Sequence, residues 1–254
     1  MAITIKSERE IELMAEAGKI LERVHNELEK ALRPGMSTKD VDTLGEEIIR
    51  SYGCIPSFLN YNGYLASICV SVNQEVVHGI PDKHRIVQEG DIVSLDAGVI
   101  YKGYHSDAAR THAVGEVSEE AKKLIQVTKE SFFEGIKFAK AGNHLFDISG
   151  AIGRYAEERG YGVVRDLCGH GIGTALHEAP EIPNYEVGRK GVRLRPGMTL
   201  AIEPMINIGT HEVDWLDDDW TVVTRDGSLS AHYENTILIT EGEPRILSLT
   251  CENE

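Results

Sequence analysis

Long apolar stretches, paired cysteines and a surplus of basic residues are all missing from this 254-residue sequence. No stretch approaches the ~20 consecutive apolar residues that a membrane-spanning helix needs. The first ten residues carry four charges, unlike a secretory signal. The four cysteines form no Cys-x-x-Cys pair, which disfavours a disulfide framework or zinc knuckle and favours reduced thiols at Cys54, Cys69, Cys168 and Cys251. We therefore expect a cytoplasmic protein with no membrane attachment.

Acidic residues outnumber basic ones, since 26 Lys and Arg stand against 41 Asp and Glu, a net charge of −15. This charge disfavours stable binding to nucleic acids or to anionic membranes. Clustered acids can instead hold cations. Apolar residues make up 41% and charged residues 26% of the chain, as in a folded globular protein. At this length we expect a single catalytic domain over 1–254, built as two halves that share one core.

Hydrophobic periodicity predicts several helices and strands. Ser7 and Glu10 have the spacing of a capping box, and apolar residues follow at helical period, so a first helix should run up to Pro34 and Gly35. Further helices are predicted at 38–51, 118–140 and 144–159. Strands are predicted at 65–78, 91–99, 198–203 and 233–240, with a glycine-rich loop at 168–173.

An internal repeat indicates how these elements are organised. Two segments recur at an offset of 107 residues: Gly35, Asp40 and Gly53 match Gly142, Asp147 and Gly160, and residues 90–96 match 197–203. A single match is as well explained by coincidence, but two at one offset favour duplicated halves of about 1–115 and 116–254. The predicted fold class is α+β, with helices covering an inner antiparallel or mixed sheet.

The repeat leads to three geometric predictions. Asp96 and Glu203 should take equivalent positions on adjacent strands, and Asp107 should correspond to Glu234. The spacing is 11 residues in the first pair of carboxylates (96 to 107) and 31 in the second (203 to 234), which leaves 20 extra residues. Residues 208–228 should therefore form an excursion beside the carboxylates that offers Trp220 to a substrate.

Asp96 and Asp107 are the first candidate metal ligands. With a two-residue turn at 101–102, these residues should lie directly opposite each other on a hairpin, on one face of the sheet. Two opposed carboxylates repel each other, and a divalent cation between them removes that cost. A solvated surface pair is the alternative.

Three further residues extend this candidate set. Glu203 ends the equivalent strand of the second half, Glu234 opens the last apolar strand, and His170 lies in the glycine-rich loop. Two Asp, two Glu and a neutral His sum to −4, which two divalent ions would neutralise. Oxygen-rich ligation with one imidazole suits Mn²⁺, Fe²⁺ or Co²⁺ as readily as Zn²⁺. Two ions ~3.5–4 Å apart are suited to hydrolysing an amide.

These residues together resemble a known family. The carboxylate hairpin, the loop Gly169-His170-Gly171-Ile172-Gly173, the Glu203-Pro204 pair and Glu234 are similar to those of type I methionine aminopeptidases of the pita-bread fold, and the similarity spans essentially the whole chain. The resemblance implies removal of the N-terminal methionine from nascent polypeptides with a small second residue, with a metal-bridged water attacking the scissile carbonyl. It implies that two divalent ions (Co, Mn, Fe, Zn or Ni) are bound by Asp96, Asp107, His170, Glu203 and Glu234.

The resemblance also implies roles for residues around the metals. His78 would contact the substrate near the scissile amide, His177 would stabilise the oxyanion, and Glu203 would shuttle a proton. The methionine pocket would be lined by Phe58, Tyr61, Tyr64, Cys69, His78 and Trp220. A monovalent cation would bind near Asn73, Glu75 and Ser230. The expected partners are polypeptide N-termini, with a transient ribosome contact, and a monomer is expected.

The chain departs from the family pattern at two places. Leu176 stands where bacterial members often carry an aromatic residue, and Ala97-Gly98 follows Asp96 where a Thr is expected. The alternatives are an Xaa-Pro peptidase of the same fold, which usually carries a separate N-terminal domain, and a binding protein that has lost its metal ligands. The sequence has neither an N-terminal zinc-binding extension nor a long insertion, so a bacterial-type enzyme is favoured.

Overall fold

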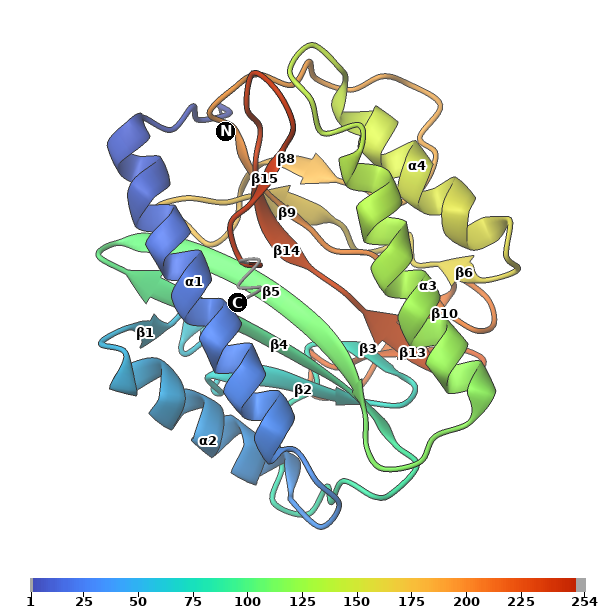
Figure 1. Ribbon diagram of the computed structural model, residues 1–254. Helices are drawn as coiled ribbons and strands as arrows, with labels where there is room; N and C mark the ends of the chain where they lie inside the picture. The colour runs from blue at the N-terminus through green and yellow to red at the C-terminus, as the bar shows by residue number, and fades with distance from the viewer. Residues whose placement is uncertain (1, 250–254) are drawn as a thin grey trace.

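The computed structural model describes residues 2–249 as four helices on one face of a central sheet (Figure 1). The helices are α1 (Glu8–Ala31), α2 (Thr38–Ser51), α3 (Glu119–Ile136) and α4 (Leu145–Glu157), with a short 3-10 turn η1 (Tyr61–Gly63). The predicted capping box at Ser7 and Glu10 opens α1. None of these helices is long and apolar enough to cross a membrane.

Fifteen short strands complete the described part of the chain. The first half contributes β1 (Ile55–Pro56), β2 (Ile68–Val72), β3 (Glu75–Val77), β4 (Ile92–Tyr101) and β5 (Tyr104–Ala113). The second half contributes β6 (Gly162–Val163), β7 (Gly169–Gly171), β8 (Glu178–Ile182), β9 (Thr199–Ile202), β10 (Met205–Asn207), β11 (Val213–Trp215), β12 (Val222–Thr224), β13 (Ser230–His232), β14 (Asn235–Leu238) and β15 (Arg245–Ile246).

The two main sheets meet along β5 and β14. One sheet has β4 between β2 and β5, and the other runs β15-β14-β9-β7-β8. At the seam, Ala109 and Glu234 exchange backbone hydrogen bonds of 3.0 and 3.4 Å. On either side a threonine hydroxyl replaces a direct bond: Thr236 bridges the backbone N–H and C=O of Asp107, and Thr111 does the same for His232. These hydrogen bonds join the two sheets into one continuous layer, so side chains from both halves can meet on the same face.

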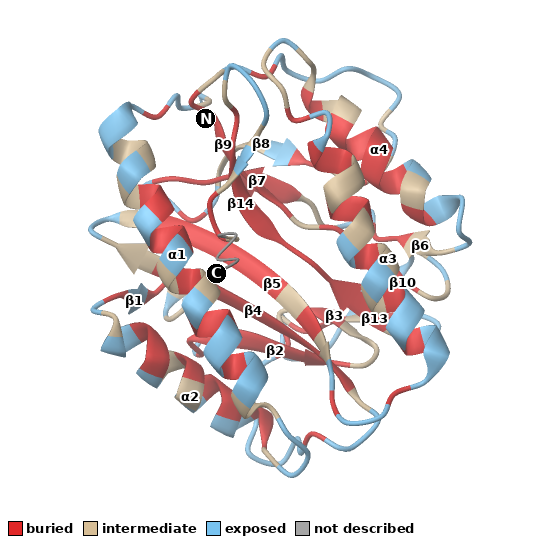
Figure 2. Ribbon diagram, viewed as in Figure 1, coloured by how far each residue is buried: buried red, intermediate tan, exposed pale blue. Residues whose placement is uncertain are grey.

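Apolar residues fill the space between the helices and the sheet, as Figure 2 shows by the buried inner faces. One cluster, including Leu21 and Leu95, lies under α1 and α2. A second, including Phe132 and Ile237, lies under α3 and α4. The free thiols are Cys54, Cys69 and Cys168, as expected, whereas Cys251 lies outside the described residues.

Residues 107 positions apart make matching local contacts. Asp40 caps α2 by accepting from the N–H of Ser37, and Asp147 caps α4 by accepting from the N–H of His144, both at 2.8 Å. The division of the chain at 115 and 116 stays a prediction. Asp96 and Glu203 do take equivalent positions, because Asp96 lies opposite Ala109, Glu203 lies opposite Glu234, and Ala109 pairs with Glu234. The prediction that they occupy adjacent strands is wrong, because β5 and β14 lie between β4 and β9.

The predicted equivalence of Asp107 with Glu234 is also wrong. A two-fold axis through the Ala109–Glu234 pair relates Thr111 to Thr236, which make the same pair of bonds. The same axis relates Asp107 to His232. Glu234 has Ala109, without a carboxylate, as its counterpart, so the second half does not copy the carboxylate pair of the first.

The β4–β5 register differs from the prediction by two residues. The turn is formed by Lys102 and Gly103, with φ of 49° and 85°, so that Asp96 faces Ala109 and Asp107 faces Gly98. Positive φ at both central residues is the requirement of a type I′ turn, and lysine seldom adopts it, which is why the turn was misplaced. A shift of two residues preserves the face, so both carboxylates still point the same way.

Candidate active site

Strand pairing places the candidate ligands on one face of the joined sheet. Asp96 lies opposite Ala109, and Asp107 lies two residues from Ala109 on the same strand. Glu234 pairs with Ala109 across the seam. Because side chains alternate between faces along a strand and opposed residues share a face, all three carboxylates emerge on the same side.

The second half adds the remaining two candidates by the same rule. Asn235 on β14 lies opposite Ile202 on β9. Because the strands are antiparallel, Glu234, which precedes Asn235, lies beside Glu203, which follows Ile202. His170 on β7 lies opposite Ala201, two residues before Glu203. The structure therefore brings all five predicted ligands together from β4, β5, β7 and the ends of β9 and β14.

His170 is oriented as a metal ligand would be. Its Nδ1 donates to the carbonyl of Gly171 at 2.9 Å, which leaves Nε2 as the lone-pair nitrogen. Nε2 lies 3.6 Å from Glu203 Oε1 and 3.9 Å from Asp107 Oδ2. Asp107, His170 and Glu234 each offer a ligand atom, and these atoms lie within 4.8 Å of one another. Burial and the neighbouring His177 lower the pKa of His170 to about 3, so the imidazole is neutral.

The four carboxyl groups are too close and too buried to be ionised together unaided. Burial raises the pKa of Asp96 to about 7. Burial, with repulsion from neighbouring carboxylates, raises the pKa of Asp107, Glu203 and Glu234 well above the ordinary value. Asp96 Oδ1 and Glu234 Oε1 are buried and accept no hydrogen bond from any residue of 2–249. Unpartnered carboxylate oxygens beside a lone-pair imidazole nitrogen fit divalent cations.

The candidate ligands line part of a cavity of about 230 Å³. Its other walls contain every residue predicted for the methionine pocket and both predicted substrate-contacting histidines: Phe58, Tyr61, Tyr64, Cys69, His78, His177 and Trp220, together with Asn62 and Leu176. Tyr64 and Trp220 make an edge-to-face contact with ring centroids 5.1 Å apart. Asn62 is a lining residue outside the predicted set, although the Asn-Tyr-Asn-Gly run around it is typical of the tight turn that η1 forms.

His177 is held by a neighbour that the sequence did not connect to it. The hydroxyl of Tyr61 lies 2.7 Å from His177 Nδ1. Burial lowers the pKa of His177, so the ring is neutral near pH 7. If Tyr61 donates to Nδ1, the proton of His177 is on Nε2 and is free to be donated.

Gly98, one of the two departures from the family pattern, is explained by packing. A Cβ atom at position 98 would lie 2.7 Å from the Cβ of Ser57 and 3.0 Å from the ring of Phe58. A threonine therefore does not fit unless Ser57 and Phe58 move. The glycine lets Phe58 lie close to β4 as a wall of the cavity.

Comparison with known proteins identifies the family. Residues 12–241 match metallopeptidase family M24. A methionine aminopeptidase of Clostridium acetobutylicum is 58% identical over 98% of this chain and 100% of its own length. The chain belongs to family M24, among its methionine aminopeptidases.

Solved structures of M24 proteins agree with this assignment. The crystal structure of methionine aminopeptidase from Thermotoga maritima superposes with a TM-score of 0.96 at 48% identity, covering 98% of this chain and 100% of that one. An Xaa-Pro dipeptidase from Bacillus anthracis gives a TM-score of 0.78 at 28% identity and is matched over only 62% of its length. The predicted α+β pita-bread fold and the family resemblance are confirmed.

Proposed function

We propose that this M24 metallopeptidase removes the N-terminal methionine from polypeptides in the cavity described above. The observation that carries the proposal is the meeting of two chemistries in one cavity. Carboxylates and an imidazole that fit divalent cations line it together with apolar and aromatic side chains, which include Trp220 and Cys69, the cross-strand neighbour of Asp96. A polarizable thioether packs well against aromatic rings and sulfur.

Two divalent ions would be held by Asp96, Asp107, His170, Glu203 and Glu234. When bound, such ions polarise a scissile carbonyl and promote hydrolysis at neutral pH. The identity of the ions (Co, Mn, Fe, Zn or Ni) and the monovalent-cation site near Asn73, Glu75 and Ser230 stay predictions.

The chain's own residues would hold the peptide and move its protons. His177, with Nδ1 engaged by Tyr61, presents Nε2–H to the oxyanion that forms at the scissile carbonyl. His78, whose pKa burial and His177 lower to about 4, is neutral and available to hydrogen-bond the substrate near the scissile amide. Glu203, which lies beside Glu234 at the strand ends, would carry a proton to the leaving nitrogen.

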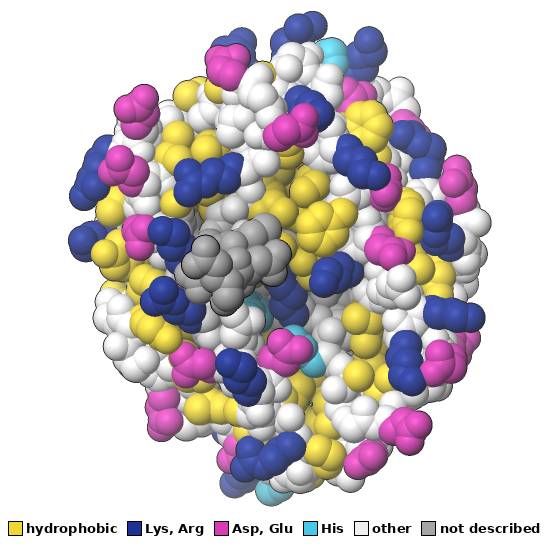
Figure 3. All heavy atoms as spheres, viewed as in Figure 1, with side chains coloured by type: hydrophobic (Ala, Val, Ile, Leu, Met, Phe, Trp, Pro, Cys, Tyr) yellow, Lys and Arg dark blue, Asp and Glu magenta, His cyan; other side chains and the backbone are white. Residues whose placement is uncertain are grey.

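The partners proposed are polypeptide N-termini, met transiently near the ribosome. On the helix-covered face, Lys and Arg side chains are interspersed with Asp and Glu (Figure 3). Over the described residues of that face, acidic side chains interrupt the basic ones, which disfavours docking on RNA by charge alone. A monomeric state is part of the proposal.

Peptide specificity tests the proposal. We expect Met-Ala-Ser to release methionine at least ~100-fold faster than Met-Lys-Ser or Met-Phe-Ser, because the proposed function includes a preference for a small second residue. Free methionine is measured after the protein has been stripped of metal and reloaded with Mn²⁺, Fe²⁺, Co²⁺ or Zn²⁺ in turn. Leu-Ala-Ser tests the thioether pocket, and Ala-Pro-Ser tests the Xaa-Pro alternative. Equal rates for Met-Ala-Ser and Met-Lys-Ser would refute the specificity.

A further inference from the structure

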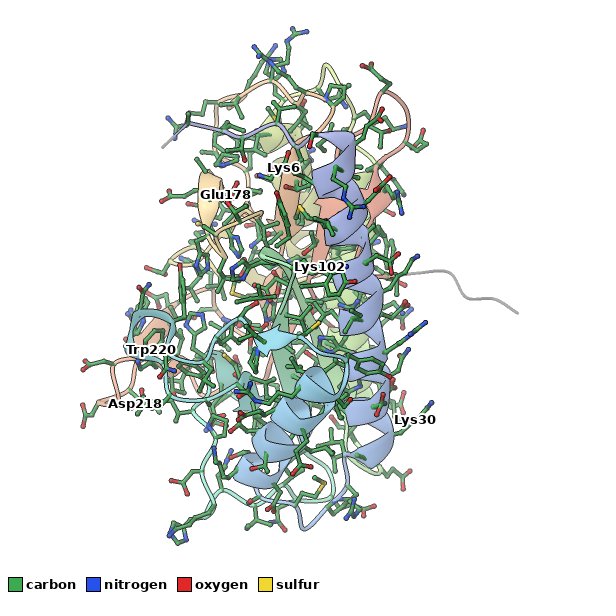
Figure 4. The ribbon with its side chains drawn as sticks, turned by 90° about the vertical axis from the view of Figure 1, so that its left-hand side faces the viewer. Lys6, Lys30, Lys102, Glu178, Asp218 and Trp220 are labelled. Atoms are coloured by element: carbon green, nitrogen blue, oxygen red, sulfur yellow. The ribbon has the colours of Figure 1, made fainter. Side chains whose placement is uncertain are left out.

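Glu178, the residue after His177, forms a buried ion pair with Lys6. Lys6 belongs to the N-terminal arm, residues 2–7, which precedes α1. Lys6 Nζ lies 2.6 Å from Glu178 Oε2, and the two side chains are only 5% and 11% exposed. The hydroxyl of Thr4 donates to the same oxygen at 2.6 Å. Figure 4 shows Lys6 and Glu178 side by side at the end of the molecule where α1 begins.

The arm end of this pair is firmly anchored. The backbone N–H of Lys6 donates to the carbonyl of Gly197 at 2.8 Å, in the turn that leads into β9. The next residue, Ser7, is the N-cap of α1. Lys6 is therefore fixed both to the long first helix and to the strand that ends at Glu203.

The other end of the pair holds the loop between β7 and β8, which carries His177. The second carboxylate oxygen of Glu178 accepts from the N–H of Ala175 at 3.4 Å, inside the same loop. A Cβ atom at Gly173 would lie 2.5 Å from both Glu178 Oε1 and the Cε of Lys6. A side chain at position 173 would therefore have to displace the ends of Lys6 and Glu178.

Burial of an ion pair is not in itself a source of stability, because the desolvation of both charges offsets their attraction. A buried pair does fix geometry, since a displaced partner would be a lone buried charge. Here the fixed loop ends at His177, whose Nδ1 must stay within hydrogen-bond reach of Tyr61 for Nε2 to face the cavity.

From these contacts we infer that Lys6 and Glu178 are positioning residues for the reaction, which hold the His177 loop in its working geometry by tying it to the N-terminal arm. The inference rests on the proposed function of His177. It assigns the arm a part in catalysis, although the arm itself lies outside the cavity lining.

The test compares Lys6→Met, Glu178→Gln and the double variant, all as the metal-loaded protein acting on Met-Ala-Ser. We expect each single variant to lower kcat by about tenfold or more with little change in KM, because small misplacements of catalytic groups are costly. The double variant should be no slower than either single one. Because the double variant removes both charges, it leaves no lone buried charge. Its kcat therefore tests the inference even if a single variant fails to fold.

Two further measurements separate positioning from general destabilisation. Amide hydrogen exchange of residues 172–178 should rise in the variants, while exchange in β4 and β5 and the metal stoichiometry stay at wild-type values. Lys140→Met is the matched control, because the Lys140–Glu243 pair is also 2.6 Å long but is exposed. Wild-type kcat in the double variant, or unchanged exchange at 172–178, would overturn the inference. A wild-type protein that releases no methionine would instead overturn the proposed function.

Discussion

At the scale of single residues, the cavity combines neutral histidines with carboxyl groups whose pKa values are raised. Burial lowers the pKa of His78 to about 4 and that of His170 to about 3. A neutral imidazole can bind a cation or donate one proton without carrying a positive charge into the site. Under the proposed function, positive charge at the scissile bond would therefore come from the cations that the carboxylates and His170 would hold.

His177→Ala is predicted to lower kcat without removing metal. Loss of one oxyanion donor typically costs ~10²–10³ in rate, and His177 is not among the candidate ligands. Steady-state kinetics on Met-Ala-Ser and metal analysis of the same preparation check this. Tyr61→Phe, which removes only the hydroxyl at Nδ1, should give a smaller loss. Wild-type kcat in His177→Ala, or loss of both ions, contradicts the assigned role.

At the scale of elements, the excursion over residues 208–228 contributes Trp220 to the wall of the cavity. Its strands β11 and β12 form a hairpin that pairs with β3. Trp220 lies in the turn of this hairpin, and its ring centroid is 6.1 Å from that of His78. Figure 4 shows Trp220 on the opposite side of the sheet from α1. The predicted position of this segment beside the carboxylates is confirmed by the shared cavity.

Trp220→Ala is predicted to weaken methionine binding more than turnover. Removing one wall should raise KM by about tenfold, equivalent to ~1.4 kcal/mol, with a smaller change in kcat. Trp215 lies on the same hairpin but is 49% exposed and outside the cavity lining, so Trp215→Ala is the control. Equal effects of the two substitutions on KM would argue against a wall formed by Trp220.

Predictability from sequence also differed among the elements. The predicted bounds of α1 and α2 lie close to the observed ones, because the capping box at Ser7 and the apolar periods of both helices are local signals. The hairpin register was missed because Lys102 adopts positive φ, which depends on the twist of the paired strands. The Tyr61–His177 and Lys6–Glu178 contacts join residues 116 and 172 positions apart, and no local pattern encodes such pairings.

At the scale of the whole molecule, the site depends on the seam between the sheets. Asp96 and Asp107 come from one side of it, and His170, Glu203 and Glu234 from the other. Arg110 lies across the seam and donates to the carbonyl of Glu234 and to Asn235 Oδ1. Metal binding and the docking of the two halves should therefore stabilise each other.

The pH dependence of stability follows from the raised carboxyl pKa values. In the metal-free protein the pKa of Asp96 is about 7, against 3.8 ordinarily, so the folded state holds the proton more tightly than the unfolded state. Its contribution to stability is fully present below about pH 4 and is lost as pH rises toward 7. In EDTA, Asp96→Asn should therefore raise Tm at pH 8 by several degrees and change it little at pH 4.5.

Excess Mn²⁺ should reverse this order at pH 8, because the wild type gains binding energy that the variant lacks. Differential scanning fluorimetry of both proteins, with EDTA or Mn²⁺ at each pH, provides the comparison. If metal-free Asp96→Asn is no more stable than the metal-free wild type at pH 8, burial does not raise the pKa of Asp96 enough to destabilise the protein.

The position of β14 has a consequence for biosynthesis. β14 is the last strand but one within residues 2–249, yet it lies at the seam, between β5 and β9. A nascent chain that has exposed β4 and β5 has only part of the ligand set, and the centre cannot be completed until Glu234 has also emerged. Completion of the five-residue ligand set therefore comes among the last events in making the molecule.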